Sequence, residues 1–146
     1  SYLNNERQGD EMELVSTMLV MRKISLFESL TSEAIQVIAE NVVKRDVSEG
    51  ETLFNEGDIA DGLYVLSQGE VVIKRADKTI ASYQAPDFFG ELALLDNAPR
   101  AGTAVALSDA QLFVLDKAAF NHITDEWPEI LREIIRKVLS YYRSVE

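Results

Sequence analysis

Residues 44–116 alternate short apolar segments with turn residues, and this alternation constrains the fold more than any other feature of the chain. The segments are rich in Val, Leu, Tyr and Phe. Turn sequences such as Glu56-Gly57-Asp58 and Gln68-Gly69 separate them. Several short strands punctuated in this way are typical of an antiparallel sandwich or barrel. We therefore predict a mainly β fold for this part of the chain.

Helical patterns precede the β segment. Residues 1–10 are polar and acidic, and we expect them to form a disordered lead-in or linker. Leu14, Met18 and Met21 then recur at helical spacing. Thr31 is placed to cap a second helix, whose apolar stripe consists of Ile35, Ile38, Ala39 and Val42. The N-terminal helices are therefore expected over about residues 11–43.

Two further helices are predicted after the β segment. Asp116 is expected to cap the first, and Pro128 suits the first position of the second, which should run to about Arg143. The apolar residues of this last helix are Ile130, Leu131, Ile134, Ile135, Val138, Leu139, Tyr141 and Tyr142. Such a stripe is wider than one packing surface requires, so the helix should face the β segment and also a ligand or another protein.

Length and charge limit the classes of protein to which the chain can belong. With 146 residues, it has room for one domain, which we place at 11–146, with the β part at about 44–116 and the C-terminal helices at about 117–144. The formal net charge of −11 argues against nucleic-acid or anionic-membrane partners. No apolar run is long enough to span a membrane, and there is no cysteine for disulfide or thiolate chemistry.

The stretch FGELALLDNAPRAGTA, residues 89–104, places a lone Arg100 among apolar and small residues. Leu92, Ala93, Leu94, Leu95 and Ala98 read as core residues. Gly90 and Glu91 open a short helix whose free N–H groups suit an anion, and the Arg100 guanidinium matches phosphate oxygens. An ionised Glu91 only accepts hydrogen bonds, so a sugar hydroxyl is a fitting donor to it.

These residues alone leave two interpretations open. In one, Glu91 and Arg100 form a clamp for a phosphorylated sugar. In the other, they form a structural ion pair that stabilises a loop and binds no ligand. Charge considerations favour neither, because buried ion pairs are often structural.

The stretch resembles the phosphate-binding cassette of the cyclic nucleotide-binding domain family. The matching residues are Phe89-Gly90-Glu91-Leu92-Ala93-Leu94, followed by Pro99-Arg100-Ala101-Gly102-Thr103. Similarity extends to Ile24-Ser25-Leu26-Phe27, Leu63-Tyr64-Val65-Leu66 and Gly69-Glu70-Val71. The resemblance implies an antiparallel, jelly-roll-like β-roll of the double-stranded β-helix type, flanked by N-terminal helices and by C-terminal helices of the B/C type.

The resemblance also assigns roles to residues. It implies that Arg100 pairs with the exocyclic oxygens of a cyclic phosphate, together with backbone amides near Ala93 and Ala101, and that Glu91 accepts from the ribose 2′-hydroxyl. Family members selective for cGMP often carry a threonine after the arginine, so Ala101 favours cAMP. The expected binding set is Phe89, Gly90, Glu91, Leu92, Ala93, Pro99, Arg100, Ala101 and Thr103.

The base-capping residue cannot be aligned from the family pattern. Tyr141 and Tyr142 are candidates by position and aromatic character, while core packing or exposure at the solvent edge accounts for them equally well. One departure from the pattern is Pro86, which stands where the family commonly has glycine.

The residues offer no set for catalysis. His122 is the only histidine, so neither a metal site with two histidine ligands nor a serine with a paired base is expected. The function implied is therefore that of a regulatory module, not an enzyme, without cofactor or metal, whose ligand is cAMP or, less favoured, cGMP. The alternative is a structural or protein-interaction module that binds no nucleotide.

The expected partners are the cyclic nucleotide and an effector domain or partner protein, with neither nucleic acid nor membrane contact by this segment. A homodimer through the last helix is a further expectation. The polar start of the chain and its end just after the last helix suggest a module of a larger protein, and the expected location is the cytoplasm, including the cytoplasmic part of a membrane protein. No basic recognition helix follows the last helix, so a transcription factor is not expected.

Overall fold

The computed structural model describes residues 2–143, with side chains from Gly9 onward. Two compact units compose it. Residues up to Asn41, together with those from Ile123 onward, form the first, which we name the helical unit. Val42–His122 form the second, the roll unit. We describe each unit separately.

The helical unit begins with α1, Tyr2–Arg22, which is followed by the short 3₁₀ helix η1, Ser25–Phe27, and by α2, Ser32–Asn41. The prediction of a disordered lead-in over residues 1–10 is not matched from Tyr2 onward, where the chain is helical, while Ser1 lies outside the described residues. The helix continues through residues 11–22, which are rich in the good helix formers Glu, Leu and Met, and no proline interrupts it. Polar character alone was therefore a poor guide to disorder here.

Two further helices follow the last strand in the sequence. They are α3, Lys117–Glu126, which crosses the boundary between the units, and α4, Pro128–Arg143. The predicted start of α4 at Pro128 is confirmed. Both predicted caps are also present, since Thr31 Oγ1 accepts from the Ala34 N–H at 3.2 Å and Asp116 Oδ1 accepts from the Ala119 N–H at 2.7 Å.

Within the helical unit, α1 packs against α2 and η1, and α4 packs against η1. The Ser25 and Tyr141 hydroxyls share a hydrogen bond, and Lys137 pairs with Glu28. The wide apolar stripe of α4 divides into two sides. Ile130, Ile134 and Val138 are buried, whereas Ile135, Leu139 and Tyr142 are between 38% and 48% exposed.

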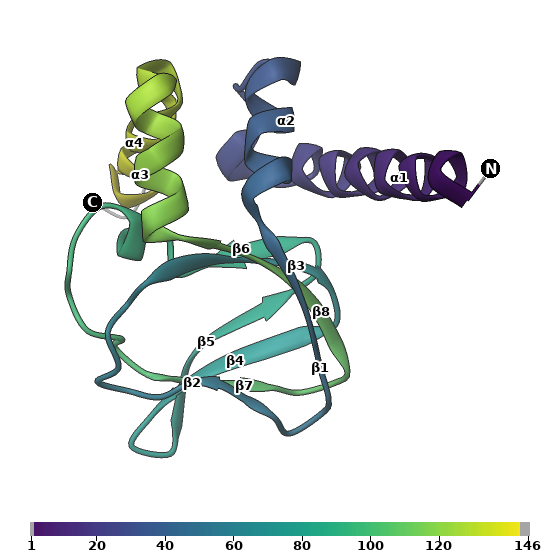
Figure 1. Ribbon diagram of the computed structural model, residues 1–146. Helices are drawn as coiled ribbons and strands as arrows, with labels where there is room; N and C mark the ends of the chain where they lie inside the picture. Colours follow the sequence, from purple (N-terminus) through teal and green to yellow (C-terminus); the bar gives the residue numbers. More distant parts are fainter. Residues whose placement is uncertain (1, 144–146) are drawn as a thin grey trace. The chain divides into compact units, whose positions relative to one another are not determined.

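Eight antiparallel strands and a second 3₁₀ helix form most of the roll unit (Figure 1). The strands are β1 Val43–Val47, β2 Thr52–Phe54, β3 Gly62–Gln68, β4 Glu70–Arg75, β5 Lys78–Gln84, β6 Asp87–Phe89, β7 Thr103–Ala106 and β8 Ala110–Asp116. They make two four-stranded sheets, in the orders β1-β8-β3-β6 and β2-β7-β4-β5. The predicted roll of antiparallel strands is therefore confirmed, as two facing sheets and not as a closed barrel.

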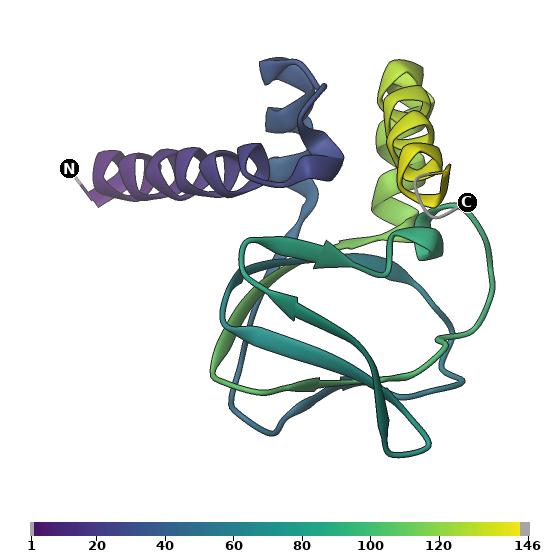
Figure 2. The ribbon, with the colours of Figure 1, turned by 180° about the vertical axis from the view of Figure 1, so that it is seen from behind.

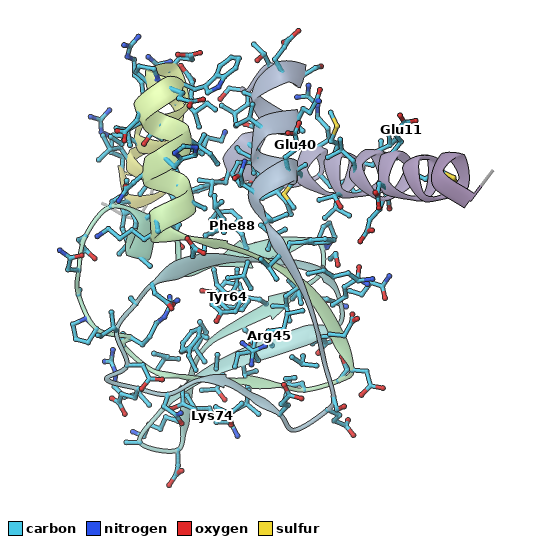
Figure 3. All side chains as sticks on the ribbon, in the orientation of Figure 1. Glu11, Glu40, Arg45, Tyr64, Lys74 and Phe88 are labelled. Carbon is cyan, nitrogen blue, oxygen red and sulfur yellow. The ribbon has the colours of Figure 1, made fainter. Side chains whose placement is uncertain are left out.

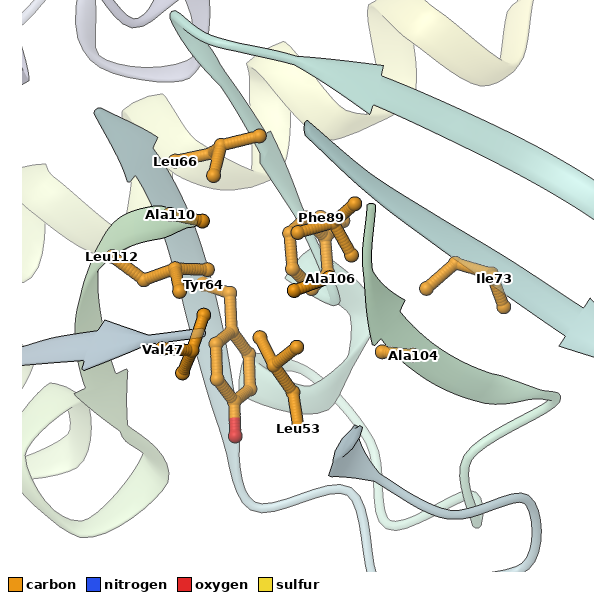
Figure 4. Close-up of a cluster of buried hydrophobic side chains, with 11 residues drawn as sticks. Val47, Leu53, Tyr64, Leu66, Ile73, Phe89, Ala104, Ala106, Ala110 and Leu112 are labelled. Carbon is orange, nitrogen blue, oxygen red and sulfur yellow. The ribbon is translucent and has the colours of Figure 1, made fainter. Parts of the chain in front are cut away.

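A cluster of buried side chains from both sheets fills the interior of the roll (Figure 4). Its members are Val47, Leu53, Tyr64, Leu66, Val71, Ile73, Phe89, Ala104, Ala106, Ala110 and Leu112. Phe89 is the last residue of β6, so the chain leaves this core directly into the candidate site. The peptide bond between Ala85 and Pro86, just before β6, is cis.

None of the helices in the described residues has both the length and the apolar character needed to cross a bilayer.

Candidate functional site

The candidate site is the segment Phe89–Thr103, which we name the cassette. Gly90 follows β6 in the left-handed region, with φ +78°, and the 3₁₀ helix η2, Glu91–Leu94, begins immediately after it. This agrees with the short helix predicted from Gly90 onward. From η2 the chain follows an open arc that returns to β7, as Figure 2 shows. The arc makes an isolated β-bridge between Pro99 and Ile59.

The apolar residues of the cassette do not all belong to the core. Ala93 and Leu94 are buried, as predicted. Leu92 and Leu95, by contrast, are 42% and 36% exposed, and Ala98 is exposed. The prediction that these three are core residues is wrong, because one turn of 3₁₀ helix and an open loop can bury only one side of the segment. Exposed apolar side chains therefore border the arc.

Among the residues whose side chains the structure describes, Arg100 is the buried charged one, with 7% of its surface exposed. Its Nη2 donates to the Gly62 carbonyl at 2.8 Å and lies 3.8 Å from Oδ1 of Asp61. The guanidinium carbon lies 4.2 Å above the ring of Phe54 and 5.5 Å from that of Tyr64. The arginine is thus held by a carbonyl, by two aromatic faces and by a mostly exposed carboxylate.

These contacts do not satisfy the whole guanidinium. The Nε atom of Arg100 is buried and has no hydrogen-bond partner. Burial lowers the pKa of Arg100 from its ordinary value, and the nearby Tyr64, Asp61 and Asp58 counteract part of this effect. A buried cation with an unused donor is unfavourable in the unliganded chain. Such a group is well suited to an anionic acceptor.

The absence of a side chain at Gly90 leaves space for the guanidinium of Arg100. An ideal Cβ built on Gly90 would lie 2.6 Å from Nη1 of Arg100 and 3.2 Å from the Gly62 carbonyl oxygen. Gly90 therefore allows the close approach of Arg100, at a backbone φ that glycine adopts without strain.

Two backbone hydrogen bonds join Arg100 to the loop before β3. Its N–H donates to the Asp58 carbonyl at 2.8 Å, and its own carbonyl accepts from the Gly57 N–H at 2.9 Å. Thr103 Oγ1 accepts from the Glu56 N–H at 3.0 Å, so this predicted site residue supports the same loop. The arginine is therefore positioned by backbone contacts and not by its side chain alone.

Two neighbouring positions carry the other predicted polar contacts. Glu91 is half-buried and is the first residue of η2. The Ala93 N–H, which the family pattern assigns to phosphate, donates to the Gly90 carbonyl at 3.1 Å. The N–H groups of Glu91 and Leu92 precede this first hydrogen bond of the 3₁₀ helix.

On the far side of the loop, Pro99 and Ala101 are exposed. The Ala101 carbonyl accepts from Nε of Arg75 at 2.8 Å. The methyl group of Ala101 therefore lies next to solvent, where a ligand could contact it.

Aromatic rings support the site from inside the roll. Tyr64 and Phe89 stack with centroids 5.3 Å apart, and Phe54 and Tyr83 pack against them. Tyr64 is buried, whereas the Arg45 side chain is 35% exposed, and Nη1 of Arg45 lies 3.5 Å from the Tyr64 hydroxyl (both are labelled in Figure 3).

Sequence reasoning missed Phe54, Tyr64, Asp61 and Gly62 as the partners of Arg100. Their only signal was composition: two aromatic residues in strands, and an Asp-Gly turn 38 positions before the arginine.

The remaining candidates lie elsewhere. Tyr141 and Tyr142 are in the helical unit, the first bonded to the Ser25 hydroxyl and the second 48% exposed. His122 is exposed on α3.

Comparison with known proteins gives a coherent set of matches. The family profile described as "Cyclic nucleotide-binding domain" matches residues 44–126, more than half of the chain. A cAMP-dependent protein kinase regulatory subunit from Hypocrea atroviridis is 32% identical over 112 residues, which are 77% of this chain and 24% of that protein. A cGMP-dependent protein kinase from Caenorhabditis briggsae is 32% identical over 104 residues, 71% of this chain and 14% of the relative. The chain thus spans a quarter or less of these two proteins.

Solved structures agree with these sequence matches. The N-terminal domain of a transcriptional regulator from Streptomyces coelicolor A3(2) superposes with a TM-score of 0.78 and 30% identity, covering 86% of this chain and 92% of that one. The structure described as "cAMP bound PfPKA-R (141-441)" superposes with a TM-score of 0.67 and 36% identity, covering 77% of this chain and 42% of that one.

Proposed function

The chain belongs to the cyclic nucleotide-binding domain family, and from that premise we propose that it binds cAMP in preference to cGMP and passes the binding signal through α3 and α4 to an effector. Its role is regulatory and not catalytic. The effector is an attached domain or a partner protein. The location that belongs to this proposal is the cytoplasm, where the chain is part of a free protein or the cytoplasmic part of a membrane protein.

The observation that carries the proposal is the buried, incompletely bonded guanidinium of Arg100. Its Nη2 has a carbonyl partner, whereas its buried Nε has none. A structural role alone would leave the cost of burying the charge poorly offset. A cyclic phosphate would supply acceptors in the fork geometry that arginine matches best, and its negative charge would offset the loss of hydration.

The other cassette residues take roles around that contact. Glu91 accepts from the ribose 2′-hydroxyl, and the early amides of η2 add donors to the phosphate. Phe89, Gly90 and Leu92 shape the wall of the site, while Pro99 and Thr103 hold the returning arm. Ala93 contributes by packing, because its amide is already bonded to Gly90.

Ala101 supports the preference for cAMP. Its exposed methyl group cannot accept a hydrogen bond from the 2-amino group of guanine, whereas a threonine hydroxyl can. Tyr141 and Tyr142 are proposed as aromatic caps for the base, with Tyr142 the better candidate because its side chain is half-exposed.

The expected affinity follows from ligand size. About 22 non-hydrogen atoms at roughly 0.3 kcal/mol each give near −7 kcal/mol, or micromolar binding, which a buried phosphate contact can improve. Replacing Arg100 by alanine would leave the phosphate without its charged donor, at a loss of about 3 kcal/mol or more, which is at least a hundredfold in affinity.

The experiment is titration calorimetry of wild type and Arg100→Ala with cAMP and cGMP. Arg132→Ala, which removes an exposed arginine from α4, is the matched control and should keep wild-type affinity. Equal heats for wild type and Arg100→Ala would refute the proposed clamp.

A second function is favoured by one observation, the exposed apolar side of α4 formed by Ile135, Leu139 and Tyr142. The alternative is a module that binds another protein, or a second copy of itself, without nucleotide. Thermal unfolding unchanged by millimolar cAMP and cGMP, together with self-association that Leu139→Glu abolishes, would favour this alternative.

A further inference from the structure

Lys117, the first residue of α3, reaches back to the cassette with its side chain. Its Nζ donates to the carbonyl of Asp96 at 2.9 Å and to Oδ1 of Asn97 at 2.5 Å. Asp96 and Asn97 lie in the open arc between η2 and Pro99. All these residues belong to the roll unit, so the contact joins two parts of one body.

Helix stability does not explain a lysine at this position. The N-terminus of a helix carries a partial positive charge, so a cation in the first turn is unfavourable there. Asp116 already caps α3 by accepting from the Ala119 N–H. The contacts that Lys117 gains lie in the cassette and not in its own helix.

The other contacts of the arc between Leu95 and Ala98 are local. The N–H groups of Leu95 and Asp96 both donate to the Leu92 carbonyl at 3.0 Å, and Asp96 Oδ1 accepts from the Ala98 N–H at 3.1 Å. The two charge-assisted hydrogen bonds from Lys117 differ from these because they tie the arc to another element, the first turn of α3.

The backbone of Lys117 makes a second connection to the site. Its N–H donates to the Asp61 carbonyl at 2.6 Å, and the Asp61 carboxylate lies 3.8 Å from Nη2 of Arg100. The start of α3 is thus linked to both the middle of the cassette and its arginine. A movement of the arc or of Arg100 on ligand binding would reach α3 directly at its first residue.

We propose that Lys117 is a positioning residue that holds the arc of the cassette to the first turn of α3 and thereby couples nucleotide binding to α3. This inference rests on the proposed function, because it gives the route by which occupancy of the cassette reaches the C-terminal helices. Coupling of this kind requires differential contacts in the free and bound states, and the ammonium contacts to the arc are the candidates.

The test compares wild type with Lys117→Met, which removes the charge but keeps most of the stem, and with Lys117→Arg, which keeps the charge and the donors. Lys78→Met, at the exposed start of β5, is the matched control. Hydrogen exchange is measured on all four full-length proteins without ligand and with saturating cAMP, and affinity is measured by titration calorimetry. Circular dichroism establishes that each variant is folded.

Without ligand, the amides of residues 95–98 should exchange about three- to tenfold faster in Lys117→Met, because two hydrogen bonds to a charged group are lost. The variant should bind cAMP about three- to tenfold more weakly, and the protection that cAMP confers on residues 117–120 should fall by at least half. Lys117→Arg should recover most of the affinity and protection, whereas Lys78→Met should match wild type.

The outcomes separate the two proposals. If wild type binds cAMP and Lys117→Met shows the same affinity and the same protection of residues 117–120, the role of Lys117 is overturned and the proposed function stands. If wild type binds neither nucleotide, the proposed function is overturned, and the coupling with it. If Lys117→Met loses protection but Lys117→Arg recovers none, a positioning role through the charged donors is also overturned.

Discussion

Arg100 occupies the space that a side chain at Gly90 would need, because an ideal Cβ on Gly90 would lie 2.6 Å from Nη1 of that arginine. The two residues are thus fitted to each other across the cassette. The glycine also has φ +78°, so its conformation and its lack of a side chain are required together. A side chain at position 90 should therefore disturb the position of the Arg100 guanidinium.

Gly90→Ala should displace the guanidinium and weaken cAMP binding by at least tenfold. Gly50→Ala is the matched control, since Gly50 has φ +86° but nothing within 4 Å of an added Cβ. Both variants should lose about 1 kcal/mol of unfolding free energy from the positive φ, but only Gly90→Ala should lose affinity. Calorimetric titration and urea unfolding measure the two effects, and an equal loss of affinity in both variants would contradict the steric explanation.

Replacing Arg100 by methionine should abolish cAMP binding without a large loss of stability. The methionine fills much of the same volume and removes a buried charge with an unbonded Nε, so the unfolding free energy should stay within about 1 kcal/mol of wild type. Urea unfolding provides the measurement. Leu112→Ala, a fully buried core truncation, should cost about 2–5 kcal/mol in the same assay.

A loss above about 3 kcal/mol in Arg100→Met would mean that the arginine is primarily structural. This outcome would favour the ion-pair interpretation of the cassette over the ligand clamp.

Ala101→Thr should raise the affinity for cGMP by about three- to tenfold and leave that for cAMP within twofold. The added hydroxyl can accept one hydrogen bond from the guanine 2-amino group, and a single such bond contributes about 0.5–1.5 kcal/mol. Competition between the two nucleotides measures the ratio. Ala98→Thr, an exposed position in the same arc, should leave the ratio unchanged. A cGMP affinity equal to that of wild type would remove Ala101 as a determinant of selectivity.

Glu28→Gln should lower the melting temperature at neutral pH but not in strong alkali. The hydrogen bond with Glu28 raises the pKa of Lys137 above its ordinary value of 10.5. Because the folded-state pKa is raised, the pair contributes fully below about pH 10.5, and its contribution is lost as the pH rises through the higher folded value.

The melting temperatures of wild type and Glu28→Gln should therefore differ at pH 8, and the difference should shrink as the pH rises beyond 10.5. Glu40→Gln, on the exposed side of α2, is the control for loss of one negative charge. A difference between wild type and Glu28→Gln that does not shrink as the pH rises beyond 10.5 would show that Lys137 is not the group responsible.

Much of the local structure could be predicted because its signals are local. Thr31 and Asp116 cap helices, and Pro128 begins one, at the places where their side chains or ring geometry predict. The short helix after Gly90 was also predicted. The N-terminal segment was not, because polar composition suggested disorder where good helix formers make α1.

The candidate site was predictable only in part. The family pattern picks out Arg100 and its neighbours, whereas the exposure of Leu92 and Leu95 depends on how η2 lies on the roll. Their roles toward a ligand remain predictions.

The sequence by itself determined the antiparallel strands and the flanking helices, because turn residues, caps and side-chain periodicity act over a few neighbouring residues. The position of the cassette followed from the family pattern. Only the tertiary structure decided what surrounds the cassette. It placed Arg100 against the Gly62 carbonyl, 38 positions away, and the Lys117 ammonium against the arc, 20 and 21 positions away. Such contacts arise from the pairing of distant strands, which sequence spacing does not encode.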